Sequence, residues 1–302
     1  MSGPAKRIAS VVSVLVLGVA LYFAPEQLQT QMINPALPNE AELRALGLDE
    51  EGPESVGYIL SASQEWKSGS DLAHPTFVIT WADGRQLLID LGMDRETAEK
   101  FERHFRDLVG AGKAQFHGTV ADQLGDDLAR VSGVALTHLH EDHVQGVQAL
   151  CQSAKDRQML LLQTDTQREK HNSMTSVGAE MVEQSCLERI TLEGMGVLTH
   201  DDFPGIGLVK TGGHTPGSTL IAVAAKGHLW LFAGDINGTK ANLESNTSKP
   251  LIYTTFIIPE NRRQNRKIRR WLNELDANED VSVVLSHDLL ELQRTPLPRI
   301  GG

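Results

Sequence analysis

The chain has 302 residues, of which 40% are hydrophobic and 22% charged, so it can bury a sizeable core in one large or two small domains. This composition excludes a disordered or collagen-like chain, and two cysteines are too few for a disulfide-dense scaffold. Lys plus Arg number 28 and Asp plus Glu number 39, which gives a formal net charge of −11. We therefore expect no nucleic-acid partner, because neutralising phosphates requires a surplus of cations.

The first 24 residues have the pattern of a targeting segment. Lys6 and Arg7 precede the uncharged run 8–24, and Pro25 follows it. This run is at the short limit for a spanning helix and slightly long for a signal-peptide core. We expect residues 1–24 to be either a cleaved signal peptide or an N-terminal membrane anchor. The rest of the chain would then be exported to the periplasm or another extracytoplasmic compartment, touching the membrane only through this segment.

Residues 25–55 have the composition of a linker, because four prolines interrupt them. Within this range, residues 40–48 predict about two helical turns. The remaining residues, 56–302, are expected to form one catalytic domain.

That domain alternates predicted strands with predicted helices, which favours an α/β (α+β) fold with layered sheets covered by helices. The alternating and apolar runs predict strands at Val56–Ala62, Thr76–Trp81, Gln86–Asp90, Gly133–Thr137, Met159–Gln163, Ile206–Thr211, Thr219–Ala225, His228–Ala233 and Val281–Ser286. Helical spacing predicts helices at Asp94–Val109, Gly118–Arg130, Val144–Cys151, 165–186 and Glu260–Leu275. Asp83-Gly84 and Lys226-Gly227 predict tight turns between strands.

The strongest chemical signal is the segment 138–143, which follows a predicted buried strand and reads His-Leu-His-Glu-Asp-His. His138 and His140 are two residues apart, so in extended backbone both imidazoles share one face. A helix starting near Asp142 would direct Asp142 and His143 at a second point. Three imidazoles and a carboxylate so close together are typical ligands for zinc or a similar first-row ion.

Three later predicted strands are also followed by a histidine or an aspartate. His214 lies in a Gly-rich turn after one strand, Asp235 follows a second, and His287 follows a third. Each feature is weak alone, since a Gly-Asp pair after a strand is usually only a turn. Together with residues 138–143 they place polar clusters at the ends of four apolar strands, where one site could collect them.

These residues resemble the pattern of the metallo-β-lactamase-fold hydrolase superfamily over residues 56–290. The resemblance implies a four-layer αββα sandwich with a two-metal site. By resemblance, one metal would bind His138, His140 and His214. The second would bind Asp142, His143 and His287, and Asp235 would bridge both metals.

The bridging carboxylate resembles the lactonase and glyoxalase II-like branches rather than true β-lactamases, which typically have Cys or Ser at that position. The layout after Asp235 is similar to that of N-acyl homoserine lactonases, which tend to carry Tyr three residues after the bridging Asp. Here that position is Gly238, which argues against assigning lactone specificity, and Tyr253 is a candidate replacement.

We therefore expect a metal-dependent hydrolase that binds two divalent ions, with Zn²⁺ as the preferred metal and Fe or Mn as alternatives. A metal-bridging hydroxide would attack an ester, lactone or related acyl substrate of small size, with Asp142 both ligating and orienting. A phosphodiesterase and an iron-dependent oxidoreductase resembling persulfide dioxygenases are the alternatives on the same fold.

Other residues are expected to have ordinary roles. Cys151 and Cys186 fit either buried thiols or one disulfide, and the oligomeric state is left open. Surface or loop positions are expected for the histidines outside the pattern, which are His74, His104, His117, His171, His200 and His228.

Overall fold

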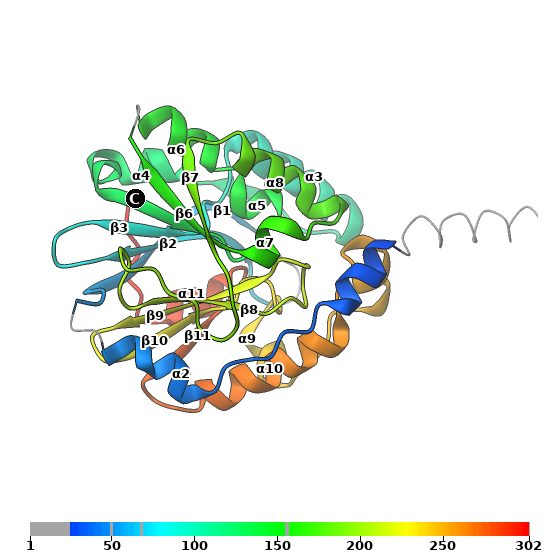
Figure 1. Cartoon of the computed structure of the whole chain (residues 1–302). Coiled ribbons are helices and arrows are strands. Elements are labelled where there is room, and N and C mark those ends of the chain that lie inside the picture. The colour runs from blue at the N-terminus through cyan, green and yellow to red at the C-terminus, as the bar shows by residue number, and fades with distance from the viewer. Residues whose placement is uncertain (1–24, 49–50, 67–68, 155–156, 302) are drawn as a thin grey trace, which may run out of the picture.

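A computed structural model describes residues 25–48, 51–66, 69–154 and 157–301. The predicted targeting segment, residues 1–24, lies outside the described residues. Within the described part, no helix is both long enough and apolar enough to cross a membrane. Two sheets lie face to face with helices outside them (Figure 1). This arrangement confirms the predicted αββα sandwich.

The larger sheet has seven strands in the order β4-β1-β2-β3-β5-β6-β7. Their bounds are β1 Ser55–Gln64, β2 Leu72–Thr80, β3 Gln86–Ile89, β4 Ala114–Phe116, β5 Val131–Ala135, β6 Met159–Thr164 and β7 Leu187–Leu192. The first four pair antiparallel, whereas β3, β5, β6 and β7 pair parallel. Parallel pairing brings the carboxyl ends of β3 and β5 to the same edge, which is where the chemical residues lie.

The smaller sheet has four strands in the order β11-β10-β9-β8. These are β8 Ile206–Lys210, β9 Thr219–Ala225, β10 His228–Phe232 and β11 Val281–Val284. Apolar side chains of the two sheets meet between them, and the rings of Phe77 and Phe232 lie 4.4 Å apart between centroids. This central core holds the two sheets, and therefore their strand ends, in fixed relation.

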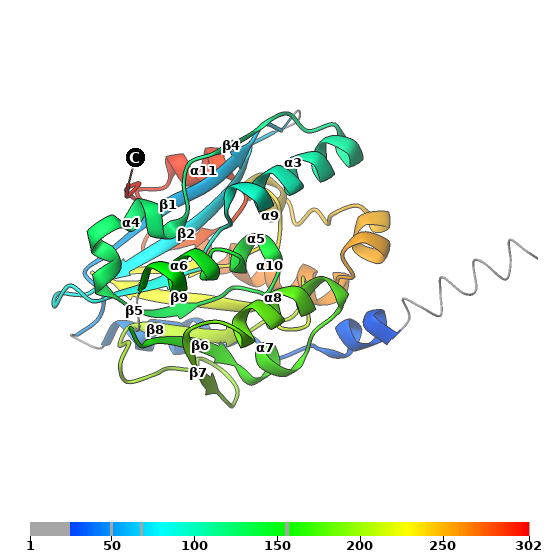
Figure 2. The same cartoon turned by 90° about the horizontal axis from the view of Figure 1, so that it is seen from above.

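Helices cover both outer faces (Figure 2). Beside the larger sheet lie α3 Arg95–Val109, α4 Val120–Leu124, the 3₁₀ helix η2 Gly125–Arg130, α5 Glu141–Val144, α6 Val147–Ala154, α7 Asp165–Glu169 and α8 Ser173–Glu183. The remaining helices are α2 Glu40–Arg44, the 3₁₀ helix η1 Ala45–Leu48, α9 Lys240–Glu244, the π-helical turn η3 Tyr253–Ile257, α10 Arg262–Asp276 and α11 Leu289–Arg294. Buried residues of α2, α9 and α10 pack on the smaller sheet.

Several elements differ from the sequence-based expectations. The predicted helix over residues 118–130 is a short α-helix followed by a 3₁₀ helix, whose first residue, Gly125, has φ +53°. Strand β4 has only three residues, and the edge strand β7 has one buried residue, Leu187, so neither carries a strong alternation. Short elements of this kind are stabilised by their neighbours more than by their own pattern.

The segment expected to be a linker packs on the body of the molecule along residues 25–48. Leu43 and Leu46 are buried in the core beneath α10. Trp271 Nε1 of α10 donates to the carbonyl of Pro38 at 3.1 Å. The predicted short helix is present as α2 and η1.

Cys151 of α6 and Cys186, just before β7, form a disulfide with a Cα–Cα distance of 5.6 Å. The sequence left open whether these cysteines are buried thiols or one disulfide, and the structure shows the disulfide.

Candidate metal centre

The site lies where β3, β5, β8, β10 and β11 end. After β5 the chain runs extended through His138 and His140 and enters α5, with His140 as the residue before the helix. His214 follows β8, Asp235 follows β10, and His287 follows β11. The structure therefore brings together all seven residues that the sequence singled out.

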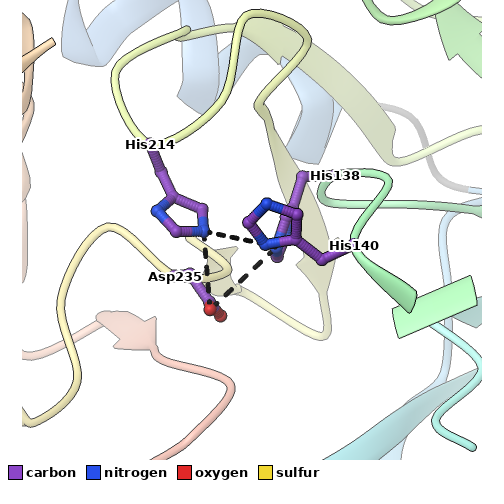
Figure 3. A group of neighbouring side chains, drawn as sticks. All are labelled: His138, His140, His214 and Asp235. Carbon is purple, nitrogen blue, oxygen red and sulfur yellow. Dashed lines mark hydrogen bonds and ion pairs between the residues drawn. The ribbon is translucent and has the colours of Figure 1, made fainter. Parts of the chain in front are cut away.

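One group of ligand-type atoms consists of His138, His140, His214 and Asp235, whose side chains point toward one another (Figure 3). Nδ1 of His140 lies 3.0 Å from Nε2 of His138 and 3.3 Å from Nε2 of His214. Asp235 Oδ2 lies 3.6 Å from His214 Nε2 and 4.0 Å from His138 Nε2. Three imidazole nitrogens and a carboxylate oxygen thus face one small volume.

A second group adjoins the first through Asp235. His143 Nε2 lies 3.4 Å from Asp235 Oδ1, and His287 Nε2 lies 3.0 Å from Asp235 Oδ2. Asp142 Oδ2 lies 3.6 Å from His143 Nε2 and 3.4 Å from His287 Nε2. Asp235 is thus the one carboxylate that faces both groups among the described residues, as a bridging ligand must.

His74 corrects one expectation, because we assigned it a surface or loop role and the structure buries it at this second group. It lies on β2, which begins earlier than predicted, and only 4% of its surface is exposed. Its Nδ1 is 3.3 Å from Asp142 Oδ2, and its ring lies edge-on to that of His287 at 5.0 Å. His74, Asp142 and His287 form a third set of ligand-type atoms. A histidine 64 positions before His138, in an apolar strand, carries no local signal for this role.

The outer nitrogens of the histidines have partners of their own. His143 Nδ1 donates to Asp90 Oδ2 at 2.8 Å, and His287 Nδ1 donates to the carbonyl of Ala73 at 2.7 Å. His214 Nδ1 lies 2.7 Å from Glu260 Oε1. Such contacts fix the ring orientation and leave the other nitrogen facing the site.

Asp90 and Glu260 are therefore site residues that sequence reasoning missed. Asp90 directly follows β3 and has φ +56°, a left-handed conformation that is unusual for a residue other than glycine. Its carboxylate also accepts hydrogen bonds from the backbone N and hydroxyl of Thr137 at 2.7 and 2.8 Å. Asp90 thereby connects β3 to the start of the histidine segment.

Glu260 and Lys249 form a buried pair beside His214. Lys249 Nζ lies 2.8 Å from Glu260 Oε1 and donates to the carbonyl of Asp235 at 2.9 Å. Burial alone would lower the pKa of Lys249, but the negative charge of Glu260 raises it, so the ammonium persists. The ring of Tyr253 is 5.9 Å from this ammonium. Lys249 thus links the segment leading to Tyr253 with the histidine cluster.

Burial sets the charge of the first histidine group. It lowers the pKa of His138 well below its usual value, and burial together with the nearby His214 lowers the pKa of His140 to about 3. Burial also lowers the pKa of His214, and Lys249 lowers it further. These three imidazoles are therefore neutral at pH 7, which is the form that binds metal ions.

Charge pairing dominates in the second group. Burial would lower the pKa of His143, but Asp142, Asp90 and Asp235 raise it well above the usual range. Burial would raise the pKa of Asp142, but His143 and other cationic neighbours lower it. The carboxylates are ionised at neutral pH, and a cation among them would replace protons on these histidines.

The donor set fits metal ions. Within the described residues, His143 Nε2, Asp235 Oδ1 and His74 Nδ1 are buried and have no hydrogen-bond partner, although all three face the cluster. Leaving buried polar atoms unpaired is costly, and a divalent cation would satisfy them together. Nitrogen and carboxylate oxygen are the ligands that zinc prefers in catalytic sites.

Comparison with known proteins gives one family match. The sequence profile of the metallo-beta-lactamase superfamily matches residues 69–284, which is more than two thirds of the chain. No curated protein matches the chain.

Several solved structures are similar. An N-acyl homoserine lactone hydrolase with N-hexanoyl-L-homoserine bound at its catalytic metal centre is 17% identical, with a TM-score of 0.58 over 82% of this chain and 98% of that one. A probable metal-dependent hydrolase from Staphylococcus aureus is 17% identical, with a TM-score of 0.55 over 80% and 91% of the two chains. AidC, a dizinc quorum-quenching lactonase, is 12% identical, with a TM-score of 0.50 over 79% and 92%. At these identities the likeness establishes a shared fold.

Proposed function

The chain belongs to the metallo-beta-lactamase superfamily of metal-dependent hydrolases, and from this premise we propose that it is a dinuclear hydrolase of esters, lactones or related acyl compounds. One observation carries the proposal. Six imidazoles and two carboxylates converge in adjoining groups that share Asp235 and His287. Lone histidines are usually structural, whereas this many buried ligand-type atoms require an ion to compensate them.

His138, His140 and His214 would hold one cation, and Asp142, His143 and His287 would hold the other, with Nδ1 of His74 facing Asp142 beside this second group. Asp235 would serve both. Zn²⁺ suits the mixture of imidazole and carboxylate, with Fe and Mn as alternatives.

When bound, the two cations would supply a water of lowered pKa and would polarise the substrate oxygen. Asp142 would accept a hydrogen bond from the attacking water and so orient it. Tyr253 stands near enough to Asp235, Asp142 and Glu260 for their charges to act on it, and burial together with these charges raises the pKa of its phenol to about 12. The phenol therefore keeps its proton and can donate a hydrogen bond to a substrate carbonyl.

Tyr253 is our candidate for contacting the substrate oxygen. Gly238 leaves open space where homoserine lactonases tend to carry a tyrosine, since a Cβ there would meet no atom within 4 Å. Tyr253 comes from a different segment, η3, and would supply the same kind of hydrogen-bond donor. The solved lactonases with similar folds support testing acyl lactones first.

The test is to purify the protein without added metal, measure its metal content, and assay a panel of lactones, thioesters, carboxylic esters and phosphodiesters. We expect about two divalent ions per chain and hydrolysis of acyl substrates that a chelator abolishes. His140→Ala and Asp142→Ala should each lower kcat/KM by at least about a thousandfold, whereas the exposed His104→Ala should not.

Other outcomes would redirect the assignment. Activity confined to phosphodiesters would make the chain a phosphodiesterase. Iron content with consumption of oxygen and a persulfide would make it an oxidoreductase. Full activity of Asp142→Ala would contradict the proposed site.

A further inference from the structure

Seven exposed apolar side chains gather on three short segments. Twelve large hydrophobic side chains are exposed among the described residues, and these seven are between 42% and 80% exposed. We call them the apolar rim, and its members are Leu28, Met32, Met174, Val177, Leu251, Ile252 and Phe256. Soluble surfaces rarely concentrate large apolar side chains in this way without a partner.

Hydrogen bonds hold the three segments together. Gln27 Nε2 donates to the carbonyl of Thr255 at 2.9 Å. Glu26 accepts from the backbone N and the hydroxyl of Ser173 at 3.0 and 2.9 Å. The helical residues 25–32 thus contact both the start of α8 and η3, and Figures 1 and 2 show these segments at one end of the molecule. The three segments that carry the apolar rim therefore adjoin one another.

The three stretches that carry the apolar rim contain no charged residue. Residues 27–39, 171–179 and 250–259 contain no Asp, Glu, Lys or Arg, although 22% of the whole chain is charged. The charged residues that directly flank the three stretches are Glu26, Glu40, Lys170, Glu180, Lys249 and Glu260. The apolar rim therefore suits contact with an apolar phase rather than with a charged partner.

The sequence that precedes this surface indicates the occupant. Leu28 lies four residues after Ala24, the last residue of the uncharged run 8–24, which Lys6 and Arg7 precede. The chain therefore enters the folded body at the apolar rim. We propose that the apolar rim rests on a lipid bilayer in which residues 8–24 are anchored, with its side chains immersed in the boundary between headgroups and acyl chains.

The same surface borders the metal centre. Arg262 donates to the carbonyl of Lys249 at 2.6 Å and to Thr254 Oγ1 at 2.8 Å, which fixes the segment between the rim and the cluster. The Lys249 ammonium then reaches Glu260 and the carbonyl of Asp235. Membrane contact would thus place lipid beside the segment that leads to the metal centre.

A fluorescent label tests the proposal on the full chain. Both native cysteines are in the disulfide, so a single introduced cysteine can be labelled selectively. We would label Phe256→Cys with an environment-sensitive fluorophore and reconstitute the protein in phosphatidylcholine vesicles. The matched control is Leu48→Cys, which is 82% exposed and lies with Lys226 and His228 at the opposite end of the smaller sheet.

We expect a blue shift at position 256 and strong quenching there by lipids that carry a nitroxide near the headgroup, with neither effect at position 48. Circular dichroism and metal content should match the unlabelled protein in both variants. An Ile252→Cys label should behave like the label at position 256.

Two results would overturn the proposal. If vesicles bind the protein but neither label at the apolar rim is quenched, only the N-terminal segment contacts lipid. If label 256 is shielded without quenching and crosslinks to its counterpart in another molecule, a second copy of the chain covers the rim. Both readouts are independent of hydrolysis, so they stand whether or not the proposed activity is found.

Discussion

At the scale of single residues, the structure shows how second partners orient the histidines. His143 is held by Asp90 at 2.8 Å and His214 by Glu260 at 2.7 Å. Glu260 also accepts a hydrogen bond from Asn265 Nδ2 at 2.9 Å and pairs with Lys249, so both of its carboxylate oxygens have partners. Partners of this kind set the ring nitrogen that faces a metal, and their loss weakens metal binding.

Glu260→Gln tests this role. The neutral amide cannot pair with the Lys249 ammonium, whose raised pKa depends on the Glu260 charge, and it holds the His214 ring less firmly. We expect metal affinity at the first group to fall by about tenfold to a hundredfold, measured by competition with a chromophoric chelator. Glu102→Gln, which alters a partly buried glutamate paired with Arg106, serves as the control. Unchanged affinity in Glu260→Gln would show that the carboxylate does not act on the site.

His74→Ala tests the histidine that the sequence did not single out. Because its unpartnered Nδ1 faces Asp142, its removal should weaken binding of the second metal equivalent and leave the first unaffected. Titration of the metal-free protein with Co²⁺, followed by visible absorption, separates the two equivalents. His104→Ala is the control, since His104 is exposed on α3. If His74→Ala still binds both metal equivalents with the affinity of the native protein, His74 has only a packing role.

At the scale of secondary structure, close packing of helices holds the ligand segment. A Cβ at Gly178 of α8 would overlap the carbonyl of Leu139, which lies between the first two histidines. A Cβ at Gly146 would likewise overlap the carbonyl of Leu91, just after β3. Glycine at these two positions lets α8 and the start of α6 approach the chain that carries the ligands.

In Gly178→Ala, helix propensity and steric overlap should change the free energy of unfolding in opposite directions. Helix propensity alone predicts a gain of about 1 kcal/mol in the free energy of unfolding. The overlap with Leu139 predicts a loss of about 1–3 kcal/mol, and we expect this loss to win because the neighbouring atom is backbone. Denaturant unfolding of Gly178→Ala beside Gly238→Ala, where a Cβ meets open space, measures the difference. A net stabilisation by Gly178→Ala would contradict this account of the packing.

At the scale of the whole molecule, one disulfide joins the outer helix α6 to the chain before the edge strand β7. Disulfides persist in oxidising compartments. This bond therefore supports our proposal, based on residues 1–24, that the domain is exported.

Replacing both Cys151 and Cys186 with Ala should lower the free energy of unfolding by about 2–4 kcal/mol, because the bond closes a loop with a sequence separation of 35 residues. Urea unfolding of the variant and of the native protein with and without reductant measures this. The reductant should destabilise only the native protein, which is the internal control. If the variant and the native protein were equally stable under oxidising conditions, the disulfide would not stabilise the fold.

Much of the architecture could be read from the sequence because it reflects local backbone geometry. Period-2 and apolar runs located nine strands, and helical spacing located the long helix α3, for which the structure shows Asp94 as the N-cap. Residues 138–143 fall in a single short window, so the spacing of His138 and His140 already predicts a shared face. The ends of three later strands supplied His214, Asp235 and His287 by the same local reasoning.

The tertiary structure alone decided which distant residues complete the site, whether the two cysteines pair, and which exposed apolar segments lie together. His74, Asp90 and Glu260 reach the cluster only because β2 and β3 pair beside β5 and because α10 packs on the smaller sheet. The disulfide and the apolar rim likewise depend on segments far apart in sequence. Sheet register and packing between elements set these contacts, and neither is encoded in the spacing of neighbouring residues.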